Sequence, residues 1–319
     1  KSITASMLAA YYSCDCDSKK LFSPFEIAKS SVFETYLNQY DTIFLNMQEF
    51  MSQSHNMDDM LKLIRKSVLW ELLEKYPDYR YFDNTNLTRT MQDVYNKSKR
   101  PFVVIIDEWD CIFRELKIGK DSQEKYLDFL RDLLKDKPYI HLAYMTGILP
   151  IKKEKTQSAL NNFNEFTMLS PGPLAPFIGF TEDEVQRLCS TYHRDFGEVK
   201  RWYNGYLLNG QQIYNPRAVV SVMQRQEFRS YWSETGTYEA IIPLINMNFD
   251  GLKNVIIEML SGANVKVDTA TFKNDTVNIH SKDEVLTYMI HLGYLGYDFS
   301  HKSVFIPNNE IRGEFVNAV

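Results

Sequence analysis

The sequence has few cysteines, no long apolar segment and no excess of basic residues. Its four cysteines are too few for a disulfide framework and do not form paired CxxC units, so we interpret them as reduced structural thiols. A metal site at Cys14 and Cys16 is the less favoured alternative. No stretch approaches the roughly 18 to 20 consecutive apolar residues of a membrane span, and no signal peptide opens the chain, which predicts a cytoplasmic protein.

The charge balance predicts no overall attraction to polyanions, although a local basic patch is compatible with it. The 36 basic and 41 acidic side chains leave a formal charge of -5, so the chain as a whole has no electrostatic attraction to nucleic acid or to an anionic membrane. The 319 residues, 44% of them hydrophobic, are enough for about two domains with an ample core. These numbers predict a globular protein.

Helical and strand-like segments alternate in the first half of the chain. Helical spacing of apolar residues predicts helices at 2–12, 57–76, 87–97 and 121–135, and short apolar runs predict strands at 41–47, 102–107, 139–147 and 164–170. Strands that alternate with helices favour parallel crossovers. We therefore expect a three-layer α/β domain with a parallel sheet.

Composition changes at the stretch SPGPLAPF, residues 170–177, whose three prolines predict a domain boundary. After it, Thr181 with Glu184 forms a capping box, and two more helices are expected around a loop at 202–216. Ser281 with Glu284 predicts a further helix, followed by a hairpin at 294–307. The predicted domains are an α/β core at 1–176, a helical lid at 177–230 and a small winged-helix-like α+β domain at 231–319.

The apolar run FVVII, residues 102–106, leads directly into acidic side chains. A run of this kind is typical of a strand that is buried on both faces, and ligands bind at the carboxyl ends of such strands. In P-loop nucleotide hydrolases the aspartate at this position holds Mg²⁺ and the next glutamate polarises the attacking water. Asp107 and Glu108 fit these roles in order, although acids that merely cap a turn would produce the same pattern.

Lys1 and Ser2 stand immediately before a predicted helix. A phosphate-binding loop ends in Gly-Lys-Ser/Thr at this position, because the lysine reaches the β and γ phosphates and the hydroxyl binds Mg²⁺. The sequence looks as if it begins within such a loop. Lys-Ser alone is a weak motif, and it becomes informative only together with the Asp-Glu pair about a hundred residues later.

Two further residues are candidates for contact with the γ phosphate. Thr146 ends the strand expected beside the Asp-Glu strand, where a polar side chain can sense the phosphate, but a Thr-Gly pair is also an ordinary turn. Arg217 follows the YNP turn and is either a lid residue that reaches the γ phosphate or a solvated arginine at a helix start.

Several short segments in a fixed order resemble the predicted AAA-ATPase-like family of bacteria, whose members are often fused to a PD-(D/E)XK nuclease-like domain. The segments are VVIIDEWD, YMTGILPIKK, QSALNNFNEFTM, GFTEDEV, WYNGY with YNP, YW with TGTYE, HLGYLGYDF and FIPNNE. The resemblance covers nearly the whole chain. One departure is Trp109, which stands where the family commonly has tyrosine.

The resemblance implies a P-loop NTPase core of the AAA (ASCE-like) type and ATP with Mg²⁺ as cofactors. It implies that Lys1 binds phosphate, that Ser2 and Asp107 hold Mg²⁺, and that Glu108 is the base. Thr146 would be the sensor.

The predicted activity is Mg-ATP binding and hydrolysis coupled to a protein partner or a fused effector. The alternative is a nucleotide-binding scaffold without catalysis. Nucleic acid is a weakly supported partner, because the helix expected at 282–291 lacks a polar reading face. No membrane partner is expected, and an oligomer is possible.

Overall fold

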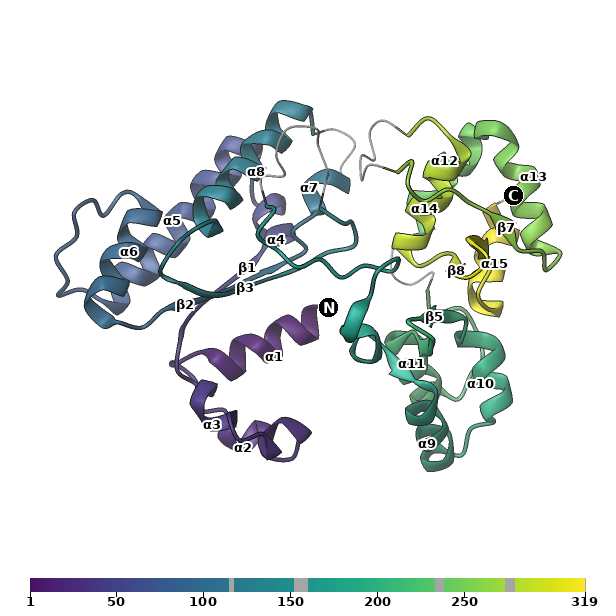
Figure 1. The fold of residues 1–319 in the computed structure, drawn as a ribbon, viewed down its shortest axis with the longest axis horizontal. Helices are drawn as coiled ribbons and strands as arrows, with labels where there is room; N and C mark the ends of the chain where they lie inside the picture. Colours follow the sequence, from purple (N-terminus) through teal and green to yellow (C-terminus); the bar gives the residue numbers. More distant parts are fainter. Residues whose placement is uncertain (115–117, 152–159, 233–237, 273–278, 319) are drawn as a thin grey trace. The chain divides into compact units, whose positions relative to one another are not determined.

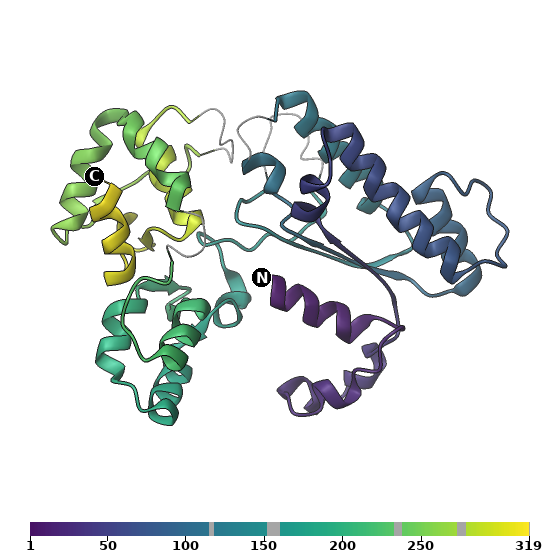
Figure 2. The same cartoon turned by 180° about the vertical axis from the view of Figure 1, so that it is seen from behind.

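The computed structural model describes residues 1–114, 118–151, 160–232, 238–272 and 279–318. They divide into two compact units, with residues 1–148 in the first and residues 164–318 in the second. Figures 1 and 2 show the ribbon from opposite sides. None of the helices in the described part of the chain is both long and apolar enough to cross a bilayer.

The first unit alternates strands and helices, as the apolar pattern predicts. Its elements are α1 (Ser2–Tyr12), α2 (Lys19–Phe22), η1 (Glu26–Lys29), α3 (Phe33–Tyr36), β1 (Asp41–Asn46), α4 (Met47–Ser52), α5 (Met57–Lys75), α6 (Leu87–Ser98), β2 (Phe102–Asp107), α7 (Cys111–Arg114), α8 (Lys120–Leu134) and β3 (Ile140–Thr146). Four of the predicted helices and three of the predicted strands are confirmed to within about two residues.

The strand β2 lies in the middle of a three-stranded parallel sheet with the order β1-β2-β3. Residues 102–106 have no exposed surface, which confirms that the apolar run is a strand buried on both faces. The α/β class with a parallel sheet is therefore confirmed. Each pair of parallel strands is joined by a crossover that contains helices.

Helices cover both faces of this sheet (Figures 1 and 2). On one face, α1 packs Ala5 against Val103 and Ile105 of β2. On the other face lie α4, α5, α6 and α8. The backbone N–H of Cys14, just after α1, donates to the carbonyl of Tyr40, just before β1, at 2.9 Å. The helix α1 therefore runs antiparallel to the strands, and its first residues lie toward their carboxyl ends.

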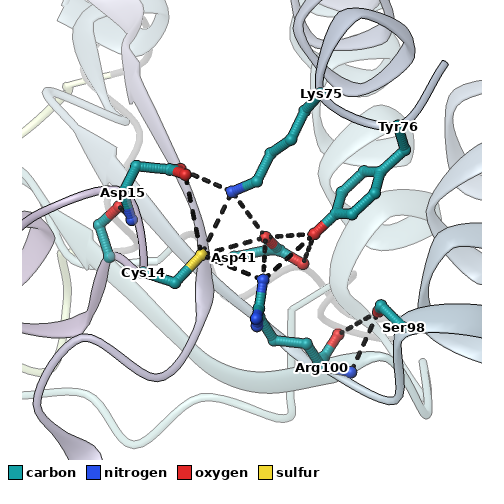
Figure 3. Close-up of polar contacts among 8 residues, drawn as sticks. Cys14, Asp15, Asp41, Lys75, Tyr76, Ser98 and Arg100 are labelled. Atoms are coloured by element: carbon teal, nitrogen blue, oxygen red, sulfur yellow. Dashed lines mark hydrogen bonds and ion pairs between the residues drawn. The ribbon is translucent and has the colours of Figure 1, made fainter.

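A polar cluster fastens the opposite, amino edge of the sheet (Figure 3). Asp41, the first residue of β1, is 3% exposed, and the Tyr76 hydroxyl donates to both of its carboxylate oxygens at 2.8 Å. The Lys75 ammonium lies 2.9 Å from the same carboxylate and the Arg100 guanidinium 3.7 Å from it. Burial raises the pKa of the Tyr76 phenol, and the bonds to Asp41 raise it further. The cluster joins β1 to the end of α5 and to the segment before β2.

Cys14 connects the end of α1 to the same cluster. Its Sγ lies 3.2 Å from Lys75 Nζ, 3.4 Å from the Arg100 guanidinium and 3.5 Å from Asp41 Oδ1 (Figure 3). Burial raises the pKa of this thiol, although the Lys75 ammonium acts in the opposite direction. The thiol therefore contributes packing and polar contacts, as expected of a structural cysteine.

The second unit contains two small antiparallel sheets, β4-β6-β5 and β7-β9-β8. Its elements are η2 (Gly172–Phe177), β4 (Phe180–Thr181), α9 (Glu182–Tyr192), α10 (Phe196–Tyr203), β5 (Tyr206–Leu208), β6 (Gln211–Tyr214), α11 (Pro216–Arg225), α12 (Tyr238–Met247), η4 (Phe249–Gly251), α13 (Leu252–Leu260), β7 (Val265–Lys266), α14 (Lys282–Leu292), β8 (Gly296–Asp298), β9 (Ser303–Phe305) and α15 (Asn309–Ala318). The capping box of α9 and the hairpin β8-β9 are confirmed.

Two local predictions are wrong. The expected loop at 202–216 contains the hairpin β5-β6, because Asn209 (φ 51°) and Gly210 (φ 79°) both take the left-handed conformation that a two-residue hairpin turn requires. The expected strand at 164–170 is a tight turn instead. There the Thr167 hydroxyl accepts from the backbone N–H of Leu169 and Ser170, which replaces sheet pairing.

A buried carboxylate holds the segment after α11 in the second unit. Glu310 of α15 is 1% exposed, and its Oε1 accepts from the backbone N–H of Tyr231 at 2.7 Å and of Trp232 at 3.1 Å. Burial raises the pKa of Glu310 to about 7, although these two bonds act to lower it. The charge of Glu314 raises this pKa and that of Arg217 lowers it.

We expect Asp41→Asn to lower the free energy of unfolding by roughly 2 to 3 kcal/mol, because the amide leaves Lys75 and Tyr76 without a charged acceptor. The matched control is Asp15→Asn, which removes a 2.6 Å contact with the same lysine from a side chain that is 63% exposed. This control should change stability by less than about 0.5 kcal/mol. Urea denaturation of both variants makes the comparison, and equal effects would contradict the role of Asp41.

Glu310 predicts a pH dependence of stability in the acid range. Its folded pKa of about 7 lies above the unfolded value of 4.5, so the folded state keeps a proton that the unfolded state releases between these pH values. The free energy of unfolding should therefore be highest below pH 4.5, as far as this group is concerned, and fall by up to about 3 kcal/mol as pH rises to 7.

The variant Glu310→Gln keeps the acceptor oxygen and should lose this slope in melting experiments between pH 5 and 8. The exposed Glu258 gives the control Glu258→Gln, which should keep the slope. A wild-type slope that survives in Glu310→Gln would contradict the assignment.

Candidate active site

Polar side chains end all three strands of the parallel sheet at the same edge. The register pairs Asn46 of β1 with Asp107 of β2, and Asp107 with Thr146 of β3. Asp107 is 2% exposed and Thr146 is 6% exposed. The structure thus brings two residues singled out from the sequence, Asp107 and Thr146, onto neighbouring strands. The Asn46 side chain already has a structural role, because its oxygen accepts a hydrogen bond from the Glu49 N–H and caps α4.

The turn after β2 presents Glu108 in an uncommon backbone conformation. Glu108 has φ 53°, in the left-handed region that few residues other than glycine adopt. Its N–H donates to Asp107 Oδ1 at 3.1 Å, and the next N–H, that of Trp109, donates to the carbonyl of Thr146 at 3.1 Å. These bonds tie the turn to the end of β3. Strained backbone of this kind is common at functional sites.

Lys1 lies at the carboxyl edge of the sheet, because the first residues of α1 lie toward that edge. It is the residue before α1, and the charges that act on its ammonium are those of Asp110, Glu108, Arg114 and Asp107. Loss of solvation around the ammonium lowers the pKa of Lys1, although the residue as a whole is exposed, and the carboxylates of Asp110 and Glu108 act in the opposite direction. Residues about a hundred positions apart therefore meet here, as the Lys-Ser and Asp-Glu motifs predict.

Ser2 is exposed and is the first residue of α1. The helix start offers backbone N–H groups and a positive dipole end to an anion. Hydroxyl and carboxylate oxygens are the ligands that Mg²⁺ prefers, and Mg²⁺ at phosphate sites needs only one or two carboxylates. Ser2 and Asp107 therefore suit this ion. Within the described residues no group of three or more His, Cys, Asp or Glu side chains could form a separate metal site.

The sequence places Asp110 with Asp107 and Glu108 at the end of the strand but gives it no role, and it does not point to Arg114. Asp110 is fully buried, and its Oδ2 accepts from the N–H of Ile148 at 3.0 Å, which links it to the segment after β3. Arg114 of α7 makes an ion pair with Glu108, and its Nε lies 3.4 Å from Asp110 Oδ2. The spacing of four residues between Asp110 and Arg114 was a signal for such a pair.

Gly147 permits the close approach of β3 to the Trp109–Asp110 segment. A Cβ atom at position 147 would lie 2.5 Å from Asp110 Oδ1 and 2.6 Å from Trp109 Cδ1. Trp109 is itself fixed, since the Tyr126 hydroxyl donates to its carbonyl at 2.8 Å. Only glycine fits at this position without displacement.

Arg217 belongs to the second unit. It lies in the first turn of α11, where its N–H donates to the Asn215 side chain at 2.9 Å. The Arg217 side chain is exposed, and its charge acts on Glu310. Its predicted contact with a γ phosphate stays a prediction.

The family profile described as "Predicted AAA-ATPase" matches residues 1–156, the segment that carries Lys1, the Asp107–Glu108 pair and Thr146. Residues 1–156 belong to the predicted AAA-ATPase-like family. This agrees with the expectation drawn from the motifs for residues 1–156, while the resemblance of the later segments stays a prediction.

Two individual proteins resemble the chain. An uncharacterized protein in the vnfD 5' region of Azotobacter chroococcum mcd 1 is 30% identical over 149 residues, which are 45% of this chain and 28% of that protein. The chain therefore matches little more than a quarter of this relative. The Walker-type ATPase paby2304 of Pyrococcus abyssi is 12% identical, with 91% of this chain and 88% of that chain covered and a TM-score of 0.45, a similarity too distant to indicate function.

Gly147→Ala tests the close packing of the end of β3 against the Trp109–Asp110 segment. The added methyl group must push β3 away from Asp110, so we expect the free energy of unfolding to fall by about 1 to 3 kcal/mol. The control is Gly119→Ala, because nothing lies within 4 Å of a Cβ atom there. Thermal melting reports the effect, and a Gly147→Ala protein as stable as wild type would show that this contact can relax.

Proposed function

We propose that the first unit binds Mg-ATP and hydrolyses it. The observation that carries this proposal is the meeting of Lys1, Asp107 and Glu108 at one edge of the sheet, with Lys1 at the start of α1. The match of residues 1–156 to the predicted AAA-ATPase-like family supports it. Bound Mg²⁺ would neutralise charge on the β and γ phosphates.

Each residue of this edge has a role that its chemistry suits. The Lys1 ammonium binds the β and γ phosphates, and Ser2 and Asp107 supply oxygens for the ion. Glu108 accepts a hydrogen bond from the water that attacks the γ phosphate in line. The Thr146 hydroxyl, on the neighbouring strand, senses the γ phosphate.

The second unit is proposed to transmit the nucleotide state to a partner or to a fused effector. In this proposal residues 1–176 are the ATPase core, although residues 164–176 belong to the second compact unit. Residues 177–230 are a lid that contributes Arg217 to the γ phosphate, and residues 231–319 are a winged-helix-like domain. The order α13, β7, α14, β8, β9 suits a winged helix. The protein is proposed to be cytoplasmic, and contact in trans with another copy would suit an ATPase of this class.

Nucleic acid is the less favoured partner of this domain. All side chains from Val285 to Leu292 of α14 are buried, which leaves this helix little surface with which to read a groove.

The test is Glu108→Gln in the full-length protein. We expect Mg-ATP affinity within about twofold of wild type and turnover at least about a hundredfold lower, because the amide cannot take the proton of the attacking water. Glu124→Gln on α8, a 55% exposed side chain, is the control and should keep wild-type turnover. Calorimetry measures binding and phosphate release measures turnover.

Three outcomes are informative. Unchanged turnover in Glu108→Gln would remove Glu108 from the mechanism. Binding without hydrolysis in wild type would favour the nucleotide-binding scaffold, and no binding at millimolar Mg-ATP would refute the nucleotide site.

A further inference from the structure

Arg114 engages the carboxylate that the proposed mechanism assigns as the base. Its guanidinium donates to Glu108 Oε2 across a close ion pair, and both side chains are only about a quarter exposed, at 25% and 27%. A guanidinium that donates to a carboxylate forms one of the stronger hydrogen bonds in proteins. Partial burial limits the screening that weakens such pairs on an open surface.

Arg114 is itself held in place from the other side. Its Nε lies 3.4 Å from Oδ2 of Asp110, which is fully buried and accepts the N–H of Ile148 at 3.0 Å. Asp110 cannot follow Arg114 outward without losing this backbone bond. One guanidinium nitrogen of Arg114, Nε, is therefore held near the sheet by Asp110, and a second nitrogen of the same group restrains Glu108.

This pair conflicts with the geometry that hydrolysis needs. A general base must lie within hydrogen-bond distance of the proton that it accepts, with an oxygen available to the water. While Arg114 donates to Oε2, the carboxylate is held toward α7, and its negative charge is balanced by the guanidinium. The γ phosphate of ATP is the anion that can compete for the same guanidinium, since arginine binds phosphate and carboxylate with similar fork geometry.

We propose that Arg114 is a positioning residue that restrains Glu108 in the nucleotide-free site, and that the Arg114–Glu108 pair opens before each hydrolysis. This inference rests on the proposed ATPase function and names a regulation of the same site. The trigger is the γ phosphate, so ATP opens the pair and ADP does not.

Arg114→Ala in the full-length protein tests the restraint. We expect kcat for phosphate release to rise about fivefold or more, because Glu108 no longer has to leave its partner. The Kd for Mg-ATP should rise by about threefold or more while that for Mg-ADP stays at the wild-type value, because only ATP brings a γ phosphate to the Arg114 guanidinium. Arg114→Lys keeps the positive charge but loses the forked guanidinium, so its kcat should lie between that of wild type and that of Arg114→Ala. This variant serves as the test if Arg114→Ala does not fold.

The matched control is Arg89→Ala. Arg89 also pairs with an aspartate four residues away, Asp93 at 3.6 Å, but on α6 and with a side chain that is 48% exposed. Its kcat and Kd should equal those of wild type. A rise of kcat in both variants would assign the effect to a general loosening of the unit and overturn the proposal.

The remaining outcomes separate this inference from the function on which it rests. If wild type hydrolyses ATP and both Arg114 variants have equal or lower kcat with unchanged Kd, the restraint is refuted while the ATPase stands. If wild type binds Mg-ATP and neither it nor Arg114→Ala releases phosphate, the hydrolysis proposal fails and the restraint fails with it.

Discussion

The parallel pairing of β2 with β1 and β3 is the constraint on which the rest of the first unit depends. Because the register aligns Asn46, Asp107 and Thr146, every polar group that ends a strand reaches one edge. A slip of one residue would turn the apolar side chains of β1 and β3 to the wrong face, so burial enforces this register. The acidic turn directly follows β2 in the chain, so the position of β2 also fixes the position of this turn.

The helix α1 links the two edges of the sheet. Its far end is fastened near Asp41 by the contacts of Cys14, and its first residues bring Lys1 to the acidic turn. A rigid helix transmits its anchoring along its length, so the polar cluster at one edge fixes the position of a lysine at the other. The two clusters have opposite characters. The one at Asp41 is closed by mutual hydrogen bonds, whereas the one at Glu108 combines a left-handed backbone, a buried carboxylate and cations that a phosphate could attract.

Charge and close packing act together at the acidic turn. Three carboxylates stand within four positions of the chain, and the cations Lys1 and Arg114 reduce their repulsion. Gly147 lets the end of β3 approach closely enough for Ile148 N–H to bond Asp110. Such an arrangement restricts motion of the Glu108 side chain.

Periodicity in the sequence was sufficient to predict the three strands and the four long helices of the first unit, but not its short helices. It also predicted the edge that carries Asp107 and Glu108, because burial on both faces of β2 needs only the apolar run itself. It was not sufficient where a local alternative competed: Thr167 bonds its own turn, and the Asn209–Gly210 pair makes a hairpin where a loop was expected. The contact of Asp41 with Tyr76 and Arg100, and the hold of Arg114 on Glu108, were decided only by the tertiary structure. Such contacts depend on which side chains the packed sheet brings within hydrogen-bond distance, and this distance cannot be predicted from sequence spacing.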